Sequence, residues 1–259
     1  MSIEELQARL VALEEENERQ RRSIDTLNRF VREGMGSYIA HEVLDVILQQ
    51  EEGAELAGER REVSMMFADI RHSTELAESM DADDYVKMLN HYLEDMIEII
   101  DSWQGNITGF AGDSIVVVYG APKRNERAAF QAVGSAVAMQ RRMPSVNEWN
   151  HAHGYPTLEI GIGIHVGEAV LGCIGSQTRM KYDMIGRNVN MAARIQGFSA
   201  GGQILVSTEA LNAAGNKIVV NPHGSKRVRA KGIRDELLLH DVVGFGSLRI
   251  PRCVAEDLH

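Results

Sequence analysis

The stretch VSMMFADIRHST, residues Val63–Thr74, decides the fold. Small or apolar residues fill both alternating sets of positions in its first half, which is typical of a central strand buried on both faces. The run ends at Asp69, a charge that is costly in a buried place unless a partner offsets it. Ser73 and Thr74 follow as candidate N-caps of the next helix. A carboxylate in this place suits a metal and phosphates, and the alternative is that Asp69 only caps its own turn.

A second carboxylate is expected close to the first. Asn106–Phe110 and Ile115–Tyr119 have the pattern of a β-hairpin, with Gly112 and Asp113 in its turn. If the hairpin lies beside the first strand, Asp113 lies near Asp69. Two carboxylates about 4 Å apart repel by about 1 kcal/mol in water and about 4 kcal/mol at an intermediate dielectric constant. Such a pair favours a divalent cation, since Mg²⁺ takes one or two carboxylates plus phosphate oxygens. The alternative is that Gly112 and Asp113 form only a turn.

The length and composition of the chain limit its domain number and the kinds of partner that it can have. A chain of 259 residues that is 44% hydrophobic has room for one domain of about 200 residues and an appendage. Its net charge of −10 weighs against nucleic acid and anionic membranes as partners. The sequence contains no apolar run long enough to span a membrane, and its start is too charged for a secretory signal. Cys173 and Cys253 are the two cysteines, which excludes a disulfide framework and indicates a cytoplasmic protein.

The N-terminal residues follow a heptad repeat. The a positions hold Ile3, Leu10, Asn17, Ile24 and Val31, and Leu6, Leu13 and Leu27 occupy d positions. β-Branched residues at a with Leu at d favour two parallel strands, and an Asn at a fixes their register. We therefore predict a parallel dimeric coiled coil over residues 1–33, with a single solvated helix as the alternative. Residues 34–61 are predicted to be a helical linker into the next domain.

Strand and helix patterns alternate beyond residue 62 without a strict βαβ repeat. The expected helices are Asp83–Asp101, Glu126–Met143 (ended by Pro144) and Val189–Gln196, and the expected later strands are Leu158–His165, Ala169–Ile174 (paired through a turn at Gly167), Gln203–Ser207 and Leu237–Val243. This order predicts an α/β (α+β) domain over residues 62–245, in which helices flank a central mixed sheet. Residues 246–259 are expected to be a C-terminal tail.

Three motifs resemble the catalytic domain of class III nucleotidyl cyclases: FADIRHST, the Gly-Asp hairpin and YDMIGRNVNMAAR. They occur in the family's order and spacing, and the resemblance runs from about Arg60 to Val243. It implies a ferredoxin-like core and an enzyme that converts a nucleoside triphosphate into a 3′,5′-cyclic monophosphate and pyrophosphate. It also implies two Mg²⁺ or Mn²⁺ ions per active site, and a head-to-tail homodimer with two sites between its chains.

The resemblance also implies roles for individual residues. Asp69, Asp113 and the carbonyl of Ile70 would be metal ligands. Asn190 would orient the ribose and Arg194 would stabilise the pentavalent phosphate, and their spacing of four places both on one face of a helix. The residues expected to lie along the triphosphate are Ser73, Thr74, Arg229 and Lys231. Without the motifs, Asn190 and Arg194 would be interpreted as ordinary helix surface.

Base recognition is where the sequence departs from the family. Adenylyl members pair an Asp, here Asp183, with a Lys four residues before the second metal aspartate, where this chain has Gly109. The guanylyl members' Glu is also missing there, and the neighbouring Thr108 would point to the opposite face of the strand. Glu168 stands where some members direct an Arg toward the triphosphate.

Three functions are compatible with these departures. Conversion of ATP to cAMP is the default expectation, with Asp183 and Gly109 at the base. One alternative is a pyrimidine cyclase that uses UTP or CTP in bacterial cyclic-nucleotide signalling against phage. An alternative of another class is a catalytically weak, nucleotide-binding regulatory dimer. A P-loop enzyme or serine hydrolase is disfavoured, since neither G-x-x-x-x-G-K-[ST] nor G-x-S-x-G occurs.

Overall fold

The computed structural model describes residues 3–35, 43, 58–176, 179–229 and 236–251. The chain divides into two compact units, Met1–Ala54 and Glu55–His259. Most of the expected linker and of the expected C-terminal tail therefore lies outside the described residues. No helix in the described part of the chain is both long and apolar enough to span a membrane.

The first unit contains α1 (Ile3–Met35), a helix of 33 residues. The helical part of the N-terminal prediction is confirmed. Four of its apolar heptad residues, Leu10, Leu13, Ile24 and Leu27, are more than half exposed. Pairing of this stripe with a second chain stays a prediction.

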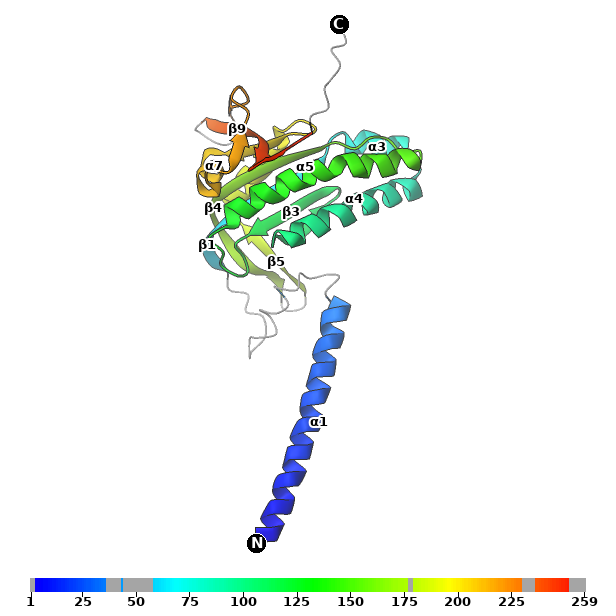
Figure 1. Cartoon of the computed structure of the whole chain (residues 1–259), viewed down its shortest axis with the longest axis vertical. Coiled ribbons are helices and arrows are strands. Elements are labelled where there is room, and N and C mark those ends of the chain that lie inside the picture. Colours follow the sequence, from blue (N-terminus) through cyan, green and yellow to red (C-terminus); the bar gives the residue numbers. More distant parts are fainter. Residues whose placement is uncertain (1–2, 36–42, 44–57, 177–178, 230–235, 252–259) are drawn as a thin grey trace. The chain divides into compact units, whose positions relative to one another are not determined.

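The second unit is built on one mixed sheet (Figure 1). Its described strands are β1 (Glu59–Ile70), β2 (Asn106–Ala111), β3 (Ser114–Tyr119), β4 (Ile160–Ser176), β5 (Arg179–Ile185), β6 (Ile204–Ser207), β7 (Ile218–Val220), β8 (Lys226–Val228), β9 (Leu237–Phe245) and β10 (Leu248–Arg249). They follow the order β10-β9-β6-β4-β1-β3-β2, with β5 also paired to β4, and β7 and β8 paired to β9. The β4–β6 pair is parallel and the other pairs are antiparallel. The predicted mixed sheet is confirmed.

Helices cover both faces of this sheet. The described helices of the unit are α3 (Ser73–Ser79), α4 (Ala82–Ser102), α5 (Ala128–Ala152), α6 (Arg187–Gly197) and α7 (Thr208–Ala214). Figure 1 shows α4 and α5 side by side along one face. Residues of α4, α5 and α7 share the main hydrophobic cluster, whereas α6 contributes Ala192 and Ile195 to two separate clusters.

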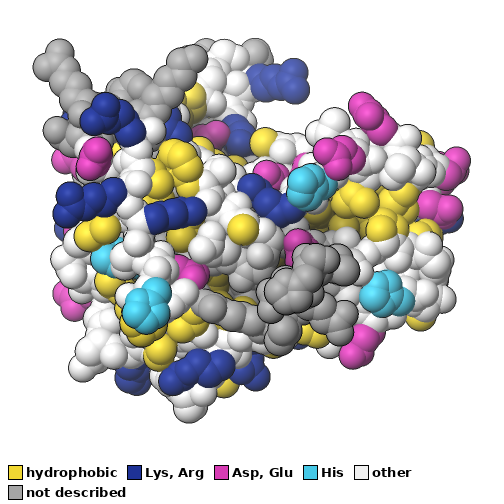
Figure 2. All heavy atoms as spheres, turned by 90° about the horizontal axis from the view of Figure 1, so that it is seen from above, with side chains coloured by type: hydrophobic (Ala, Val, Ile, Leu, Met, Phe, Trp, Pro, Cys, Tyr) yellow, Lys and Arg dark blue, Asp and Glu magenta, His cyan; other side chains and the backbone are white. Residues whose placement is uncertain are grey.

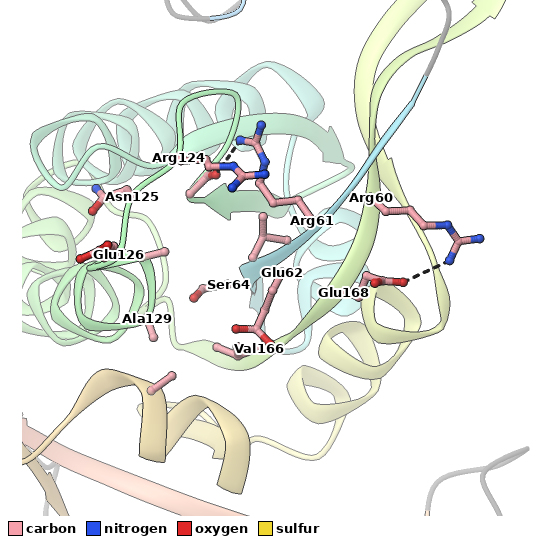
Figure 3. A pocket seen from close by; sticks show the side chains of 14 residues that line it. Arg60, Arg61, Glu62, Ser64, Arg124, Asn125, Glu126, Ala129, Val166 and Glu168 are labelled. Atoms are coloured by element: carbon pink, nitrogen blue, oxygen red, sulfur yellow. Dashed lines mark hydrogen bonds and ion pairs between the residues drawn. The ribbon is translucent and has the colours of Figure 1, made fainter.

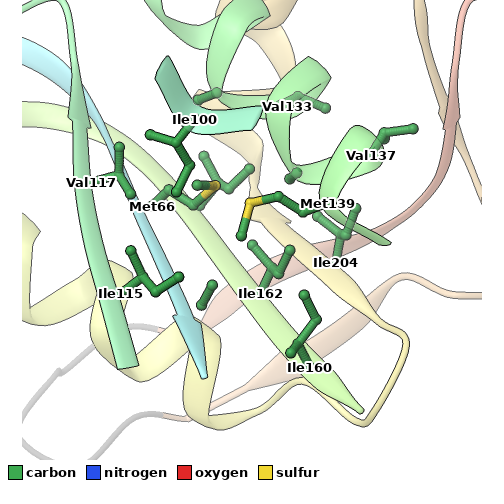
Figure 4. Packing of buried hydrophobic residues seen from close by; sticks show 14 of the residues in the cluster. Met66, Ile100, Ile115, Val117, Val133, Val137, Met139, Ile160, Ile162 and Ile204 are labelled. Atoms are coloured by element: carbon green, nitrogen blue, oxygen red, sulfur yellow. The ribbon is translucent and has the colours of Figure 1, made fainter. Parts of the chain in front are cut away.

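Strand β1 is the buried centre of the unit, as the sequence predicted. Met66 and Ala68 pack into the cluster formed with α4 and α5, while Val63 and Met65 belong to the cluster that contains Ala192. Figure 4 shows Met66 among side chains of neighbouring strands and helices in the main cluster. The strand begins at Glu59 rather than Val63, so residues 59–61 belong to the sheet and not to the linker.

Strand β4 corrects the expected turn at Gly167. It runs unbroken from Ile160 to Ser176, and Gly167 pairs with Val63 of β1 inside it. The glycine serves a close approach instead, because a Cβ on Gly167 would lie 2.6 Å from Nδ2 of Asn188. A Cβ on Gly163 would lie 2.2 Å from the backbone nitrogen of Gln196. Glycine therefore lets α6 lie directly on β4.

Helix α5 corrects the expected stop at Pro144. The helix continues through this residue to Ala152. A proline inside a helix removes one hydrogen bond and costs about 3 kcal/mol, but tertiary contacts hold both sides of this one. Met143 and Val146 are buried in the core, and the Asn147 amide bonds both the carbonyl and the N–H of Leu158, at 2.9 and 2.8 Å.

Candidate active site

The two predicted acids meet at one end of the sheet. The β1–β3 pairing ends at Ala68 opposite Ile115, which places Asp69 just beyond the last paired residue. Asp113 follows Gly112 at the tip of the hairpin. Gly112 has a φ of 66°, an angle that glycine adopts readily because it has no Cβ. The Asp113 carboxylate accepts a hydrogen bond from the Ile70 N–H at 3.0 Å. The hairpin therefore places the Asp113 carboxylate in contact with Ile70, the residue that follows Asp69.

Asp69 is held in an unfavourable electrostatic position. Its side chain is 31% exposed and accepts hydrogen bonds from Arg71 Nη2 at 3.1 Å and, more weakly, from Gln196 Nε2 at 3.4 Å. Burial and the neighbouring Asp113 carboxylate raise the pKa of Asp69 to about 6, and Arg71 only partly offsets them. Such a shift is common where a site is built to meet a cation or a proton.

The donor set fits a hard divalent cation. Two carboxylates and strand backbone offer oxygen ligands, the kind that Mg²⁺ prefers. Among the described residues, no group of three His, Cys, Asp or Glu side chains could hold a metal by itself. A cation at Asp69 and Asp113 would therefore need further oxygens, which a triphosphate provides.

Helix α6 presents two different faces. Its inner face packs on β4 and directs Gln196 toward Asp69. Asn190 and Arg194 are both exposed, on a shared outer face as predicted. At about 100° per residue, Arg194 and Gln196 point about 160° apart around the helix. One α6 therefore cannot direct Gln196 and Arg194 to the same acids.

The predicted triphosphate residues are not brought together in one chain. Ser73 is half-buried and Thr74 is exposed, and both lie in the first turn of α3. Neither is the N-cap, because His72 occupies that position with φ of 58° and makes no side-chain cap bond. Arg229 is exposed and pairs with Glu236 at 3.5 Å, one residue beyond β8. Lys231 lies outside the described residues.

Acidic side chains surround the start of α3 and α4. Glu75 lies in the first turn of α3, and Asp81, Asp83 and Asp84 lie at the start of α4. Figure 2 shows Asp and Glu side chains on the right of the face it displays, the side on which Figure 1 places these segments. A triphosphate near Ser73 therefore needs cations from elsewhere.

The residues predicted to contact the base lie beside a lysine that the sequence analysis missed. Asp183 lies on β5, a strand that was not predicted, and Lys181 two residues earlier donates to its Oδ2 at 3.0 Å. The same ammonium lies against Gly109, where a Cβ would be 2.6 Å from Nζ. The Thr108 hydroxyl is buried without a partner among the described residues, so it does not reach this face. Alternation along β5 is the signal that could have revealed Lys181.

Two further residues beside the acids were also missed. Arg71 bonds Asp69 and, through Nη1, the carbonyl of Ser199 at 3.3 Å, while its Nε has no partner among the described atoms. Gln196 bonds Asp69 and the carbonyl of Gly161. A cation two residues after Asp69 is visible in the sequence, but the contact of Gln196 depends on how α6 packs.

The side chain of Glu168 points to Arg60, at the end of β1 opposite to Asp69. It forms an ion pair with Arg60 at 3.1 Å, and both residues line a cavity of about 420 Å³. Figure 3 shows this pair, while the side chain of Arg61 points away from it, and the Arg61 guanidinium bonds the carbonyls of Gly120 and Pro122 at 3.1 and 2.8 Å. The carboxylate of Glu168 is therefore partly neutralised.

Comparisons with known proteins identify the family of this chain. Residues 56–241 match the model of the adenylate and guanylate cyclase catalytic domain. Adenylate cyclase 1 of Rhizobium meliloti is 32% identical over 187 residues, which are 71% of this chain and 28% of that protein. The chain thus spans less than a third of this relative's length.

Two solved structures have the same fold. The guanylyl cyclase Cya2 is 38% identical with a TM-score of 0.73, and the adenylyl cyclase CyaB from P. aeruginosa is 33% identical with a TM-score of 0.70. In both comparisons the match covers 76% of this chain and all of the other. The similar structures thus include both a guanylyl cyclase and an adenylyl cyclase. The chain belongs to the family of class III adenylyl and guanylyl cyclase catalytic domains, which are phosphorus–oxygen lyases.

Proposed function

We propose that this chain converts a nucleoside triphosphate, by default ATP, into the 3′,5′-cyclic monophosphate and pyrophosphate. The observation that carries the proposal is the meeting of Asp69 and Asp113 at the end of β1. Burial and the neighbouring carboxylate raise the pKa of Asp69, which is costly to the fold when this acid is ionised, and a cation with a triphosphate would offset that cost.

The reaction needs little covalent chemistry from the protein. The 3′-oxygen attacks the α-phosphorus, its proton leaves, and the bond to pyrophosphate breaks in line, so positioning and charge stabilisation govern the rate. When bound, two Mg²⁺ or Mn²⁺ ions would activate the attacking oxygen and stabilise the leaving one. Asp69, Asp113 and the Ile70 carbonyl would hold them, and Ser73 and Thr74 would lie along the triphosphate.

The transition-state residues are proposed to come from a second chain. Asn190 would orient the ribose, Arg194 would donate to the α-phosphate, and Arg229 and Lys231 would contact the terminal phosphates. Support comes from α6, whose outer face points away from the acids that its inner face contacts. A head-to-tail homodimer pairs the outer face of one chain with the acids of the other and makes two equal sites.

Complementation tests this arrangement. Asp69→Asn and Arg194→Ala chains should each be inactive alone. Mixed after co-refolding, half of the dimers are heterodimers with one intact site of two, so activity should recover to about a quarter of wild type. If the mixture stayed as inactive as its components, both halves of a site would belong to one chain.

Product analysis tests the reaction itself. The protein is incubated with each of the four ribonucleoside triphosphates and Mn²⁺, and the products are separated. We expect one preferred cyclic product, and Asp69→Asn or Asp113→Asn should lower turnover by at least about 100-fold. Asp83→Asn, an exposed acid in α4, is the matched control. Normal turnover in either site variant contradicts the metal assignment, and absence of any cyclic product from all four substrates contradicts the proposal.

A further inference from the structure

Lys181 and Asp183 form a fixed pair on the exposed side of β5. Two residues apart on one strand, they point to the same face, and Lys181 Nζ donates to Asp183 Oδ2 at 3.0 Å. Asp183 Oδ1 accepts a second bond from the Met184 N–H at 2.9 Å. The carboxylate is thereby held in place, while the ammonium has three N–H donors and needs one of them for Asp183.

Gly109 provides the space in which this ammonium lies. A Cβ at Gly109 would be 2.6 Å from Nζ of Lys181 and 3.3 Å from its Cε. The strand pairing also shifts between Ile107 and Gly109, a bulge that changes how β2 faces its neighbours. A side chain at position 109 would therefore displace the Lys181 side chain from its observed position.

The ion pair between Lys181 and Asp183 is expected to contribute little to the stability of the fold. The side chains of Lys181 and Asp183 are 57% and 34% exposed, and exposed ion pairs contribute only about 0–1 kcal/mol. A cation beside a carboxylate does, however, complement a base edge on which one acceptor adjoins one donor. Adenine has such an edge in its ring N1 and 6-amino group.

We propose that Lys181 is a base-contacting, specificity-determining residue, and that it supplies from β5 the ammonium that this chain lacks at position 109. The proposal rests on the proposed cyclase function. With ATP as the substrate, the Lys181 ammonium donates to ring N1 and the Asp183 carboxylate accepts from the 6-amino group. The departure at Gly109 is then a relocation of the lysine rather than a loss of base recognition.

Removal of the ammonium is the first test. Lys181→Ala should lower kcat/KM for the preferred triphosphate by about 10- to 100-fold, the range for losing one hydrogen bond with a charged partner. Its preference over the other three triphosphates should also fall. The matched control is Lys87→Ala, which removes a similarly exposed lysine that bonds Asp84 at 3.0 Å on α4. Thermal unfolding of each variant checks that the fold is kept.

Relocation of the lysine is the second test. Gly109→Lys alone puts two cations into one space and should lower activity, whereas Gly109→Lys combined with Lys181→Ala should recover much of the lost kcat/KM. If wild type is active but Lys181→Ala changes neither kcat/KM nor the order of substrates, this proposal is wrong and the cyclase function stands. If Lys181→Ala is impaired but the double variant recovers nothing, the ammonium does not act at the place left by Gly109. If wild type makes no cyclic product, both proposals fail.

Discussion

Replacing Asp69 with Asn should make the fold more stable at neutral pH. Burial and Asp113 raise the pKa of Asp69 from 3.8 to about 6. The folded state therefore binds the proton more tightly than the unfolded chain, and its stability falls as pH rises from about 4 to about 6. Two pKa units correspond to about 3 kcal/mol, and solvent screening at a side chain 31% exposed reduces this to about 1–2 kcal/mol. Asn has no charge, so Asp69→Asn regains this free energy above pH 6.

Thermal unfolding without divalent cations measures the effect. At pH 7.5 the melting temperature of the second unit should rise by about 2–8 °C in Asp69→Asn, and the gain should shrink to about a third at pH 4.5. Saturating Mg²⁺ should stabilise wild type more than the variant, since it binds the ionised acids. Asp83→Asn, at an exposed position, should show no gain. A variant that melts at or below the wild-type temperature at pH 7.5 would refute the reasoning, because Asp69 would then be stabilising as an anion.

Three more substitutions or deletions have definite outcomes. Gly163→Ala should lower the free energy of unfolding by about 1–3 kcal/mol and reduce turnover, because its Cβ would lie 2.2 Å from the backbone of Gln196 and force α6 outward. Unchanged urea unfolding and unchanged turnover would contradict this. Ile162→Ala, at a fully buried core position, should cost about 2–5 kcal/mol in urea unfolding, and a loss below about 1 kcal/mol would mean that the core closes around the gap. Deleting Met1–Val31 should lower activity in dilute solution and restore it at high protein concentration, whereas turnover per chain independent of concentration would show that α1 does not hold the dimer together.

Local patterns predicted the parts of the fold that local chemistry decides. The double alternation in β1 and the Gly112 turn identified neighbouring strands, and with them the meeting of Asp69 and Asp113. These features depend on side-chain periodicity and on the conformational freedom of one glycine, which are written in short stretches of sequence.

Tertiary contacts decided the parts that were missed. Gly167 has the composition of a turn, but the residue that requires a glycine there is Asn188 of α6, about twenty positions later. Pro144 has the signature of a helix end, but buried neighbours and Asn147 hold α5 together through it. Because β5 was not recognised as a strand, the shared face of Lys181 and Asp183 could not be inferred.

The proposed functional groups share a physical property that separates them from the rest of the chain. The raised pKa of Asp69 predicts that this acid weakens the fold at neutral pH, and the exposure of the Lys181–Asp183 pair predicts that it adds little stability. The outer face of α6 leaves Arg194 exposed. The apolar heptad residues Leu10, Leu13, Ile24 and Leu27 of α1 are likewise exposed in a single chain. None of these features is expected to stabilise a single folded chain. A cation would neutralise the acids, a base would bond the Lys181–Asp183 pair, and a second chain would cover the exposed surfaces. The proposed dimer would bring Arg194 of one chain to the acids of the other, and the predicted coiled coil would cover the apolar residues of α1, so one symmetric assembly would account for both exposed surfaces.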